Sequence, residues 1–174
     1  MPRHVVAARA PVRLIGAFVD LCGRIPVSLP LLLLRVTVAI PFWKSGLTKF
    51  DGFLQVSPGA VWLFANDFQL HILGETYAYP FPAAVTLLSG LGELILPTLL
   101  VFGLGARFAS LGLLAMTGII QLTVPDGWQT YHLPWAAMLF PILAMGPGRI
   151  AVDAVIARYF RVRDHRASGC VATE

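Results

Sequence analysis

Long apolar runs, separated by short polar or glycine-rich stretches, dominate the chain. A helix rises 1.5 Å per residue, so about 20 apolar residues are needed to cross the hydrocarbon core of a bilayer. Four runs come close to this length, and they cover residues 29–47, 81–102, 108–124 and 131–146. The last run is short and contains two prolines, so by length alone a re-entrant segment is an alternative there. The pattern predicts an all-α fold, a four-transmembrane-helix bundle.

One ionisable residue, Glu93, interrupts the run 81–102 near its middle. A carboxylate at that depth costs several kcal/mol unless it is paired, protonated or beside water, so it normally faces the interior of a bundle. At helical spacing, Glu93 shares a face with a set of small or polar residues. These residues are Thr86, Ser89, Gly90 and Pro97. The remaining surface is mostly leucine and isoleucine, which suits lipid.

The run 29–47 carries its own charge, Arg35, whose helical face also holds Ala39, Phe42, Gly46 and Lys49. Counted from the same side of the membrane, Arg35 lies about 9 Å and Glu93 about 15 Å along their spans. An ion pair between them is the least costly way to bury both charges, and we expect one. Such a pair is either a structural clamp between the two helices or part of a ligand site or proton relay.

A second polar group is expected near the opposite membrane surface. It consists of Lys49, Gln121, His132 and Trp135. These side chains are predicted to converge beneath the aromatic segment 58–81, around a pocket that is polar at its mouth and apolar deeper. With Arg35 and Glu93 they form the set of candidate ligand-site residues. A lone histidine in such a position is more often a hydrogen-bonded interface residue than a ligand or base.

Three flanking segments carry weaker signals. The connection 51–80 is rich in aromatic residues, and a short helix near 59–66 is expected at headgroup depth, more as a belt than as a binding lid. Residues 1–28 are predicted to be a cytoplasmic segment with an interfacial helix, with a mitochondrial transit peptide as the alternative. Residues 29–148 are predicted to form the membrane domain. Residues 149–174 are predicted to form a cytoplasmic basic amphipathic helix, over 149–163, and a tail.

Composition agrees with a membrane protein, because 57% of the residues are hydrophobic and 13% are charged, against about 25% charged in a soluble domain. The net charge of +4 does not point to nucleic acid, since the basic residues are segregated by the predicted spans. With four spans, only Lys44 and Lys49 fall on one side. The other side holds Arg3, Arg9, Arg13, Arg24, Arg107, Arg149, Arg158, Arg161, Arg163 and Arg166. The positive-inside rule then puts both termini in the cytoplasm, and a bacterial inner membrane is the expected location.

The sequence lacks the common signatures of catalysis. Its two cysteines, Cys22 and Cys170, form no CxxC motif and no cluster with histidine, so no disulfide framework, metal site or covalently bound cofactor is expected. There is no phosphate-binding glycine loop, no nucleophile elbow and no histidine pair at membrane depth for haem. The chain is therefore not expected to catalyse a reaction alone.

Three motifs resemble those of one family. The run RVTVAIPFWKSGLTKF, residues 35–50, is similar to the first helix of the DoxX family at Arg35, Phe42, Gly46, Lys49 and Phe50, while Ala39 replaces the usual glycine. The second span is similar to the glutamate-bearing helix of that family, which a glycine and an arginine follow, here Glu93, Gly103 and Arg107. The run GPGRIAVD, residues 146–153, is similar to its closing motif. In order and spacing, residues 30–156 resemble the DoxX family of small four-helix bacterial membrane proteins.

The resemblance implies several functions without choosing between them. Some members resemble the membrane subunit of a thiosulfate:quinone oxidoreductase, and others are partners of soluble enzymes in oxidative-stress or metal-stress modules. One hypothesis is therefore a redox-module subunit that docks a soluble redox enzyme and binds a quinone. A second is a non-catalytic anchor or assembly factor, and a third is a homo-oligomeric small-solute transporter that uses Glu93. In each case the lipid bilayer is the expected environment and nucleic acid is not a partner.

Overall fold

The computed structural model describes residues 9–159, which are mostly helical. The main helices are α2 (Arg9–Gly23), α3 (Ser28–Leu47), α4 (Pro58–Asn66), α5 (Pro82–Phe102), α6 (Ala106–Thr123) and α7 (Leu133–Met145). A 3₁₀ turn, Pro125–Gly127, and a π turn, Trp128–His132, connect α6 to α7, and a further short helix covers 152–159. The rest of the predicted C-terminal helix and tail, with Cys170, Arg161, Arg163 and Arg166, and the N-terminal Arg3 lie outside the described residues.

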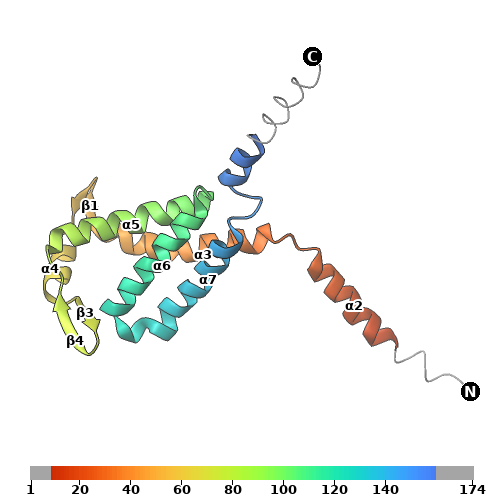
Figure 1. Cartoon of the computed structure of the whole chain (residues 1–174), viewed down its shortest axis with the longest axis horizontal. Helices are drawn as coiled ribbons and strands as arrows, with labels where there is room; N and C mark the ends of the chain where they lie inside the picture. Colours follow the sequence, from red (N-terminus) through yellow and green to blue (C-terminus); the bar gives the residue numbers. More distant parts are fainter. Residues whose placement is uncertain (1–8, 160–174) are drawn as a thin grey trace, which may run out of the picture.

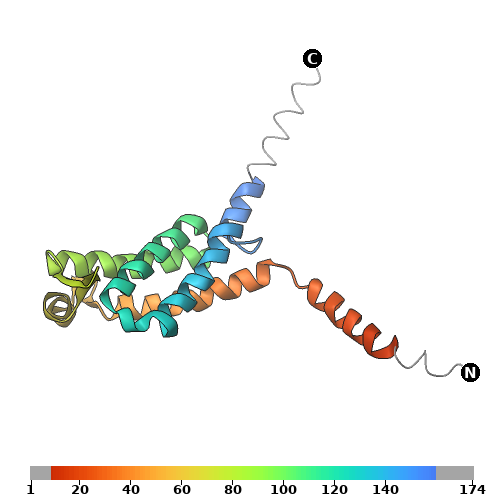
Figure 2. The same cartoon turned by 60° about the horizontal axis from the view of Figure 1, so that its bottom comes forward.

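Four helices form the body of the molecule (Figures 1 and 2). In this bundle α5 packs against α3 and α6, and α7 packs against α6 and α3, so the four helices close into a ring. The buried core between them is aliphatic apart from one aromatic ring. Its members are Leu31, Val38, Phe42, Leu100, Ala106, Ala109, Leu113, Leu139 and Ile142.

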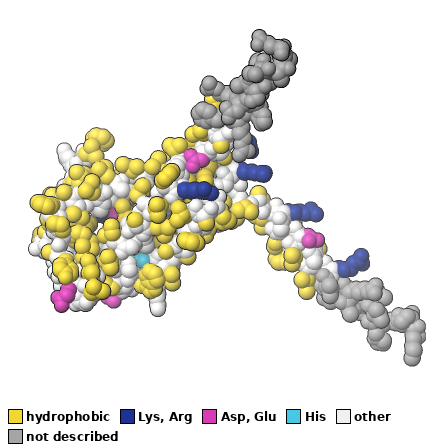
Figure 3. Space-filling model, in the orientation of Figure 1, with side chains coloured by type: hydrophobic (Ala, Val, Ile, Leu, Met, Phe, Trp, Pro, Cys, Tyr) yellow, Lys and Arg dark blue, Asp and Glu magenta, His cyan; other side chains and the backbone are white. Residues whose placement is uncertain are grey.

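The helical faces follow the sequence pattern. In α5 the buried residues are Thr86, Gly90, Glu93, Pro97 and Leu100, which confirms most of the predicted polar face. Side chains on the opposite face are exposed, among them Leu88 at 69% and Ile95 at 52%. Figure 3 shows hydrophobic side chains spread over much of the visible face of the bundle. In water this much exposed apolar surface would be unfavourable, so it indicates lipid as the surrounding medium.

Within residues 9–159, three helices, α3, α5 and α6, are long and apolar enough to cross a membrane, which indicates a membrane protein. The fourth helix of the bundle, α7, has 13 residues. At helical rise it is about 20 Å long, shorter than the hydrocarbon core of about 30 Å. The four-helix bundle is thus present, whereas a fourth membrane crossing does not follow from the length of α7.

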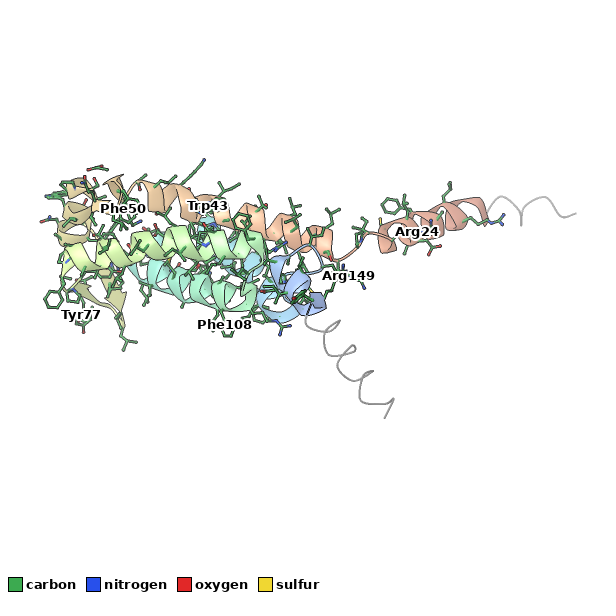
Figure 4. The ribbon with its side chains drawn as sticks, turned by 90° about the horizontal axis from the view of Figure 1, so that it is seen from above. Arg24, Trp43, Phe50, Tyr77, Phe108 and Arg149 are labelled. Atoms are coloured by element: carbon green, nitrogen blue, oxygen red, sulfur yellow. The ribbon has the colours of Figure 1, made fainter. Side chains whose placement is uncertain are left out.

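The connection between α3 and α5 contains two antiparallel hairpins, so the all-α prediction was incomplete. β1 (Phe50–Gly52) pairs with β2 (Gln55–Val56), and β3 (Gln69–Ile72) pairs with β4 (Glu75–Ala78). The second hairpin turns through two residues of positive φ, as its right-handed twist requires. The predicted short helix 59–66 is confirmed by α4, which lies between the hairpins in sequence. Figure 4 shows Phe50 and Tyr77 at this end of the bundle and Arg149 at the other, here called the hairpin end and the terminal end.

Helices α3 and α5 are staggered along the bundle axis (Figure 1). A Cβ placed on Gly46 would lie 3.1 Å from Cβ of Glu93, so these two positions are level with one another. Near the other end of the contact, Arg35 lies against Gly103. Consequently α3 extends past α5 at the terminal end, and α5 extends past α3 at the hairpin end.

Helix α2 projects away from the bundle at the terminal end (Figures 1 and 2). Its formation confirms the helix expected in residues 1–28. Its apolar side chains are exposed, namely Leu14, Ile15, Phe18, Val19 and Leu21. The predicted position of this helix on the membrane surface stays a prediction.

Candidate functional site

A buried ion pair joins Lys49, two residues after the end of α3, to the middle of α5. Lys49 Nζ donates to Oε2 of Glu93 at 2.6 Å, and the two residues are 8% and 4% exposed. The same ammonium group donates to Oγ of Ser45 at 3.0 Å and reaches the Ser45 carbonyl oxygen at 3.4 Å. Two buried charges are most tolerable when they are paired and further hydrogen-bonded; here the charges are paired, and the ammonium is further hydrogen-bonded to Ser45.

Small residues allow this close approach. A Cβ on Gly90 would lie 2.6 Å from the Phe50 ring and 3.3 Å from Cβ of Lys49. A Cβ on Gly46 would meet the side chain of Leu94 at 2.9 Å. Any larger residue at either position would push α3 and α5 apart and lengthen the Lys49–Glu93 contact.

The predicted ion pair between Arg35 and Glu93 is wrong, and the stagger of the helices is the reason. Glu93 lies level with Gly46, which is eleven residues from Arg35 in α3, or about 16 Å at helical rise. Estimating depth from the two span ends assumed that the ends are level. The apolar pattern correctly predicted how each helix is rotated about its own axis. It did not predict how far each helix is shifted along that axis.

Arg35 instead belongs to a structural contact at the terminal end, the latch formed by residues 146–153. Its side chain is fully buried and donates to the Ile150 carbonyl oxygen. Asp153 accepts hydrogen bonds from the N–H groups of Gly105 and Ala106, at 2.9 and 3.2 Å, which caps the start of α6. The N–H of Arg149 donates to Oγ of Ser28 at 2.8 Å, so the latch also holds the start of α3.

A cavity of about 800 Å³ adjoins the Lys49–Glu93 pair. Residues of α3, α4, α5, α6 and α7 line it, and most of the lining is apolar. Its polar lining includes Ser45, Thr48, Lys49, Ser57, Ser89, Glu93 and Thr123, and its aromatic lining consists of Phe42, Phe64, Phe68, Tyr79 and Trp135. The aromatic connection, predicted mainly as a belt, thus contributes part of the wall.

Aromatic contacts hold two sides of the cavity in place. The rings of Phe42 and Trp135 lie 5.0 Å apart, and Phe64 packs edge-on against Phe68 and Tyr79 at 5.1 and 5.4 Å. The hydroxyl of Tyr79 is hydrogen-bonded to that of Thr123 at 2.6 Å, which ties this side to the end of α6.

The predicted group at the opposite surface is only partly assembled. Lys49 and Trp135 line the cavity, whereas Gln121 and His132 do not. His132 donates from Nδ1 to Oε1 of Gln121 at 2.6 Å, since Nε2 of Gln121 donates to the Pro125 carbonyl oxygen. His132 also packs against Trp135, with ring centroids 5.5 Å apart. These two residues brace the connection between α6 and α7 from behind the cavity wall.

The burial of His132 makes the stability of the protein expected to depend on pH. Burial lowers the pKa of His132 below its ordinary value of 6.5. Between the pKa of His132 in the folded protein and its higher pKa in the unfolded chain, the unfolded chain binds more protons. The contribution of neutral His132 to stability is therefore fully present above about pH 7.5 and falls as the pH drops below 6.5. Thermal unfolding in detergent at pH 8 and pH 5.5 should show a larger loss in the wild type than in His132→Gln, which does not titrate. Equal losses in the two proteins would contradict a role for His132.

Sequence reasoning missed Ser45 and Asp153 as structural partners. Ser45 lies four residues before Lys49, the spacing that brings side chains together on one helical face, so its contact was predictable. The acceptor role of Asp153 depends on how residues 146–153 fold back onto α6. No local pattern indicates that path.

Comparison with known proteins identifies a family through one family model. The DoxX family model matches residues 30–126, a stretch that contains Arg35, Lys49 and Glu93. A protein described as uncharacterized from Haemophilus influenzae is 28% identical over 142 residues, which cover 75% of this chain and 85% of that protein. No solved structure matches the chain. Because the family match covers more than half of the sequence, the chain belongs to the DoxX family.

Proposed function

We propose that this protein is the membrane subunit of a redox module and binds a lipid-soluble ligand of the quinone type in the cavity beside Lys49 and Glu93. The observation that carries the proposal is the combination of apolar walls, aromatic rings and one buried ion pair around about 800 Å³. That volume falls within the range of small-molecule sites, which are mostly apolar with a few converging polar groups. An anchor without a ligand would need no such cavity.

The position of the cavity wall supports entry from the bilayer. Leu88 of α5 and Ile119 of α6 both line the cavity, yet they are 69% and 52% exposed. They belong to neighbouring helices that each qualify as a membrane span. The cavity therefore reaches the apolar outer surface of the bundle, where a lipid-soluble molecule would arrive.

The proposed topology has four crossings, with α7 as the last and both termini in the cytoplasm. Within the described part, blue side chains gather toward the terminal end in Figure 3. The acidic residues Asp51, Asp67, Glu75 and Asp126 belong to the hairpins, the end of α4 and the turn after α6, all at the hairpin end. This distribution follows the positive-inside rule. The terminal end is then the side on which a soluble redox enzyme would dock, and the bacterial inner membrane is the proposed location.

A reporter fusion tests the topology. Alkaline phosphatase folds into an active enzyme only outside the cytoplasm, so a fusion after Glu174 is expected to be inactive, and a fusion in the β3–β4 turn active. The opposite pair of results would overturn the proposed orientation. Activity at both sites would show that α7 does not cross the membrane.

A binding experiment tests the ligand. A short-tailed ubiquinone analogue added to the purified protein in detergent should quench tryptophan emission saturably, because Trp135 lines the cavity. Ala115→Phe places a ring in the cavity from α6 and should weaken binding at least about tenfold. Ala83→Phe is the control, since Ala83 is exposed on α5 and does not line the cavity. Non-saturable quenching that is identical in all three proteins would leave the anchor hypothesis standing.

A further inference from the structure

The hydrogen-bond donors of Lys49 are already occupied. A lysine ammonium has three hydrogens and no acceptor. Nζ of Lys49 has three acceptors within reach, namely Oε2 of Glu93 at 2.6 Å, Oγ of Ser45 at 3.0 Å and the Ser45 carbonyl oxygen at 3.4 Å. The ammonium therefore has no hydrogen left for a ligand.

In Glu93, by contrast, one carboxylate oxygen has no hydrogen-bond donor among the described residues. Within residues 9–159, the carboxylate receives a hydrogen bond on Oε2 only, and Oε1 is not enclosed by protein atoms. The residue is 4% exposed and lines the cavity. An ionised carboxylate can accept about four hydrogen bonds, and a ligand that covered Oε1 without donating to it would leave that acceptor buried and unpaired, which is unfavourable. The cavity thus presents a charged acceptor that a ligand with a donor would satisfy.

The ion pair limits the charge of that ligand. Lys49 and Glu93 are the charged residues of the lining, and their charges cancel at 2.6 Å. A ligand that carried a full charge into the apolar cavity would meet no net opposite charge to offset its desolvation. An uncharged head group is therefore favoured.

Ser45 completes the pattern. Its Oγ accepts from Lys49, and a hydroxyl group keeps one proton that it can donate. A ligand hydroxyl can donate to Oε1 of Glu93 and accept from Ser45 at the same time. A quinone carbonyl or an ether oxygen can only accept from Ser45, and it would place its lone pairs opposite the carboxylate.

On the basis of the proposed function, we infer that the ligand is a neutral lipophile with a hydroxyl donor, a phenol or hydroquinone, bound in preference to the corresponding quinone or ether. The preference corresponds to one charge-assisted hydrogen bond in an apolar site. Such a bond changes affinity by about tenfold or more.

A redox-inert ligand pair tests the inference without electron transfer. 4-Octylphenol and its methyl ether, 4-octylanisole, differ only in the donor. Binding to the full-length protein in detergent, measured by isothermal titration calorimetry, should be at least about tenfold tighter for the phenol. Glu93→Gln should reduce this ratio strongly, whereas Glu75→Gln, the same change on the exposed strand β4, should leave it unchanged.

A second variant covers the case in which Glu93→Gln does not fold. Ser45→Ala removes a hydroxyl that can donate a hydrogen bond to either ligand. The affinities for the phenol and for the ether should therefore both fall, while the ratio between them stays the same. Equal affinities, or a preference for the ether, in the wild type would overturn the inference and leave the proposed function in place. Failure of both compounds to bind would overturn the proposed function itself.

Discussion

Removing one charge of the Lys49–Glu93 pair should lower the free energy of unfolding by about 3–5 kcal/mol, because the remaining charge is then buried without a partner. Glu93→Leu leaves the ammonium with Ser45 alone, and Lys49→Met leaves a carboxylate with no donor among the described residues. The double variant should recover most of this loss, since it replaces an ion pair with apolar groups of similar size. Unfolding in mixed detergent micelles measures all four proteins as a double-mutant cycle.

Two controls make this cycle specific. Lys44→Met removes an exposed lysine of α3, five residues before Lys49, and should change stability by less than about 0.5 kcal/mol. The combination of Arg35→Met with Glu93→Leu should be additive, because these sites lie on different levels of the bundle and share no contact. If instead Arg35 and Glu93 were strongly coupled and Lys49 and Glu93 were not, the ion pair assigned to this site would be refuted.

The helical period explains why so much of the membrane domain was predictable. Three or four residues separate neighbours on one helical face, so the apolar pattern alone identified which sides of α3 and α5 are buried. The four runs correspond closely to α3, α5, α6 and α7 for the same reason. A periodic pattern, however, determines the rotation of a helix about its axis and says little about its translation along that axis.

The stagger of α3 and α5 comes from features outside the periodic pattern. Helix α3 ends at Leu47, and β1 begins at Phe50 beside Gly90, well inside the length of α5. The strands that follow have two to four residues each, too short for an alternating pattern to emerge from the sequence. The glycines at 46 and 90 were the available indication of close contact at this level, and they point to Lys49 rather than Arg35 as the partner of Glu93.

The latch offers an equally sharp test at the terminal end. Gly103 ends α5 with φ of +69°, a conformation that favours glycine, and a Cβ there would collide with Nη1 of Arg35 and approach Cβ of Ala151 to 2.5 Å. Gly103→Ala therefore combines backbone strain with overpacking, and we expect it to destabilise the protein by about 3 kcal/mol. Because Arg35 is fully buried and bonded to Ile150, it has little room to move aside.

Gly105 is a matched control two residues away. It also has a positive φ, +56°, but a Cβ there would meet no atom within 4 Å. Gly105→Ala should therefore show the strain alone, about 1 kcal/mol, and its N–H can still donate to Asp153. Unfolding of both variants in the same micelles separates the two contributions. A larger loss for Gly103→Ala would establish that the latch holds Arg35 tightly against the end of α5, whereas equal losses would show that Arg35 yields and that the contact contributes little to stability.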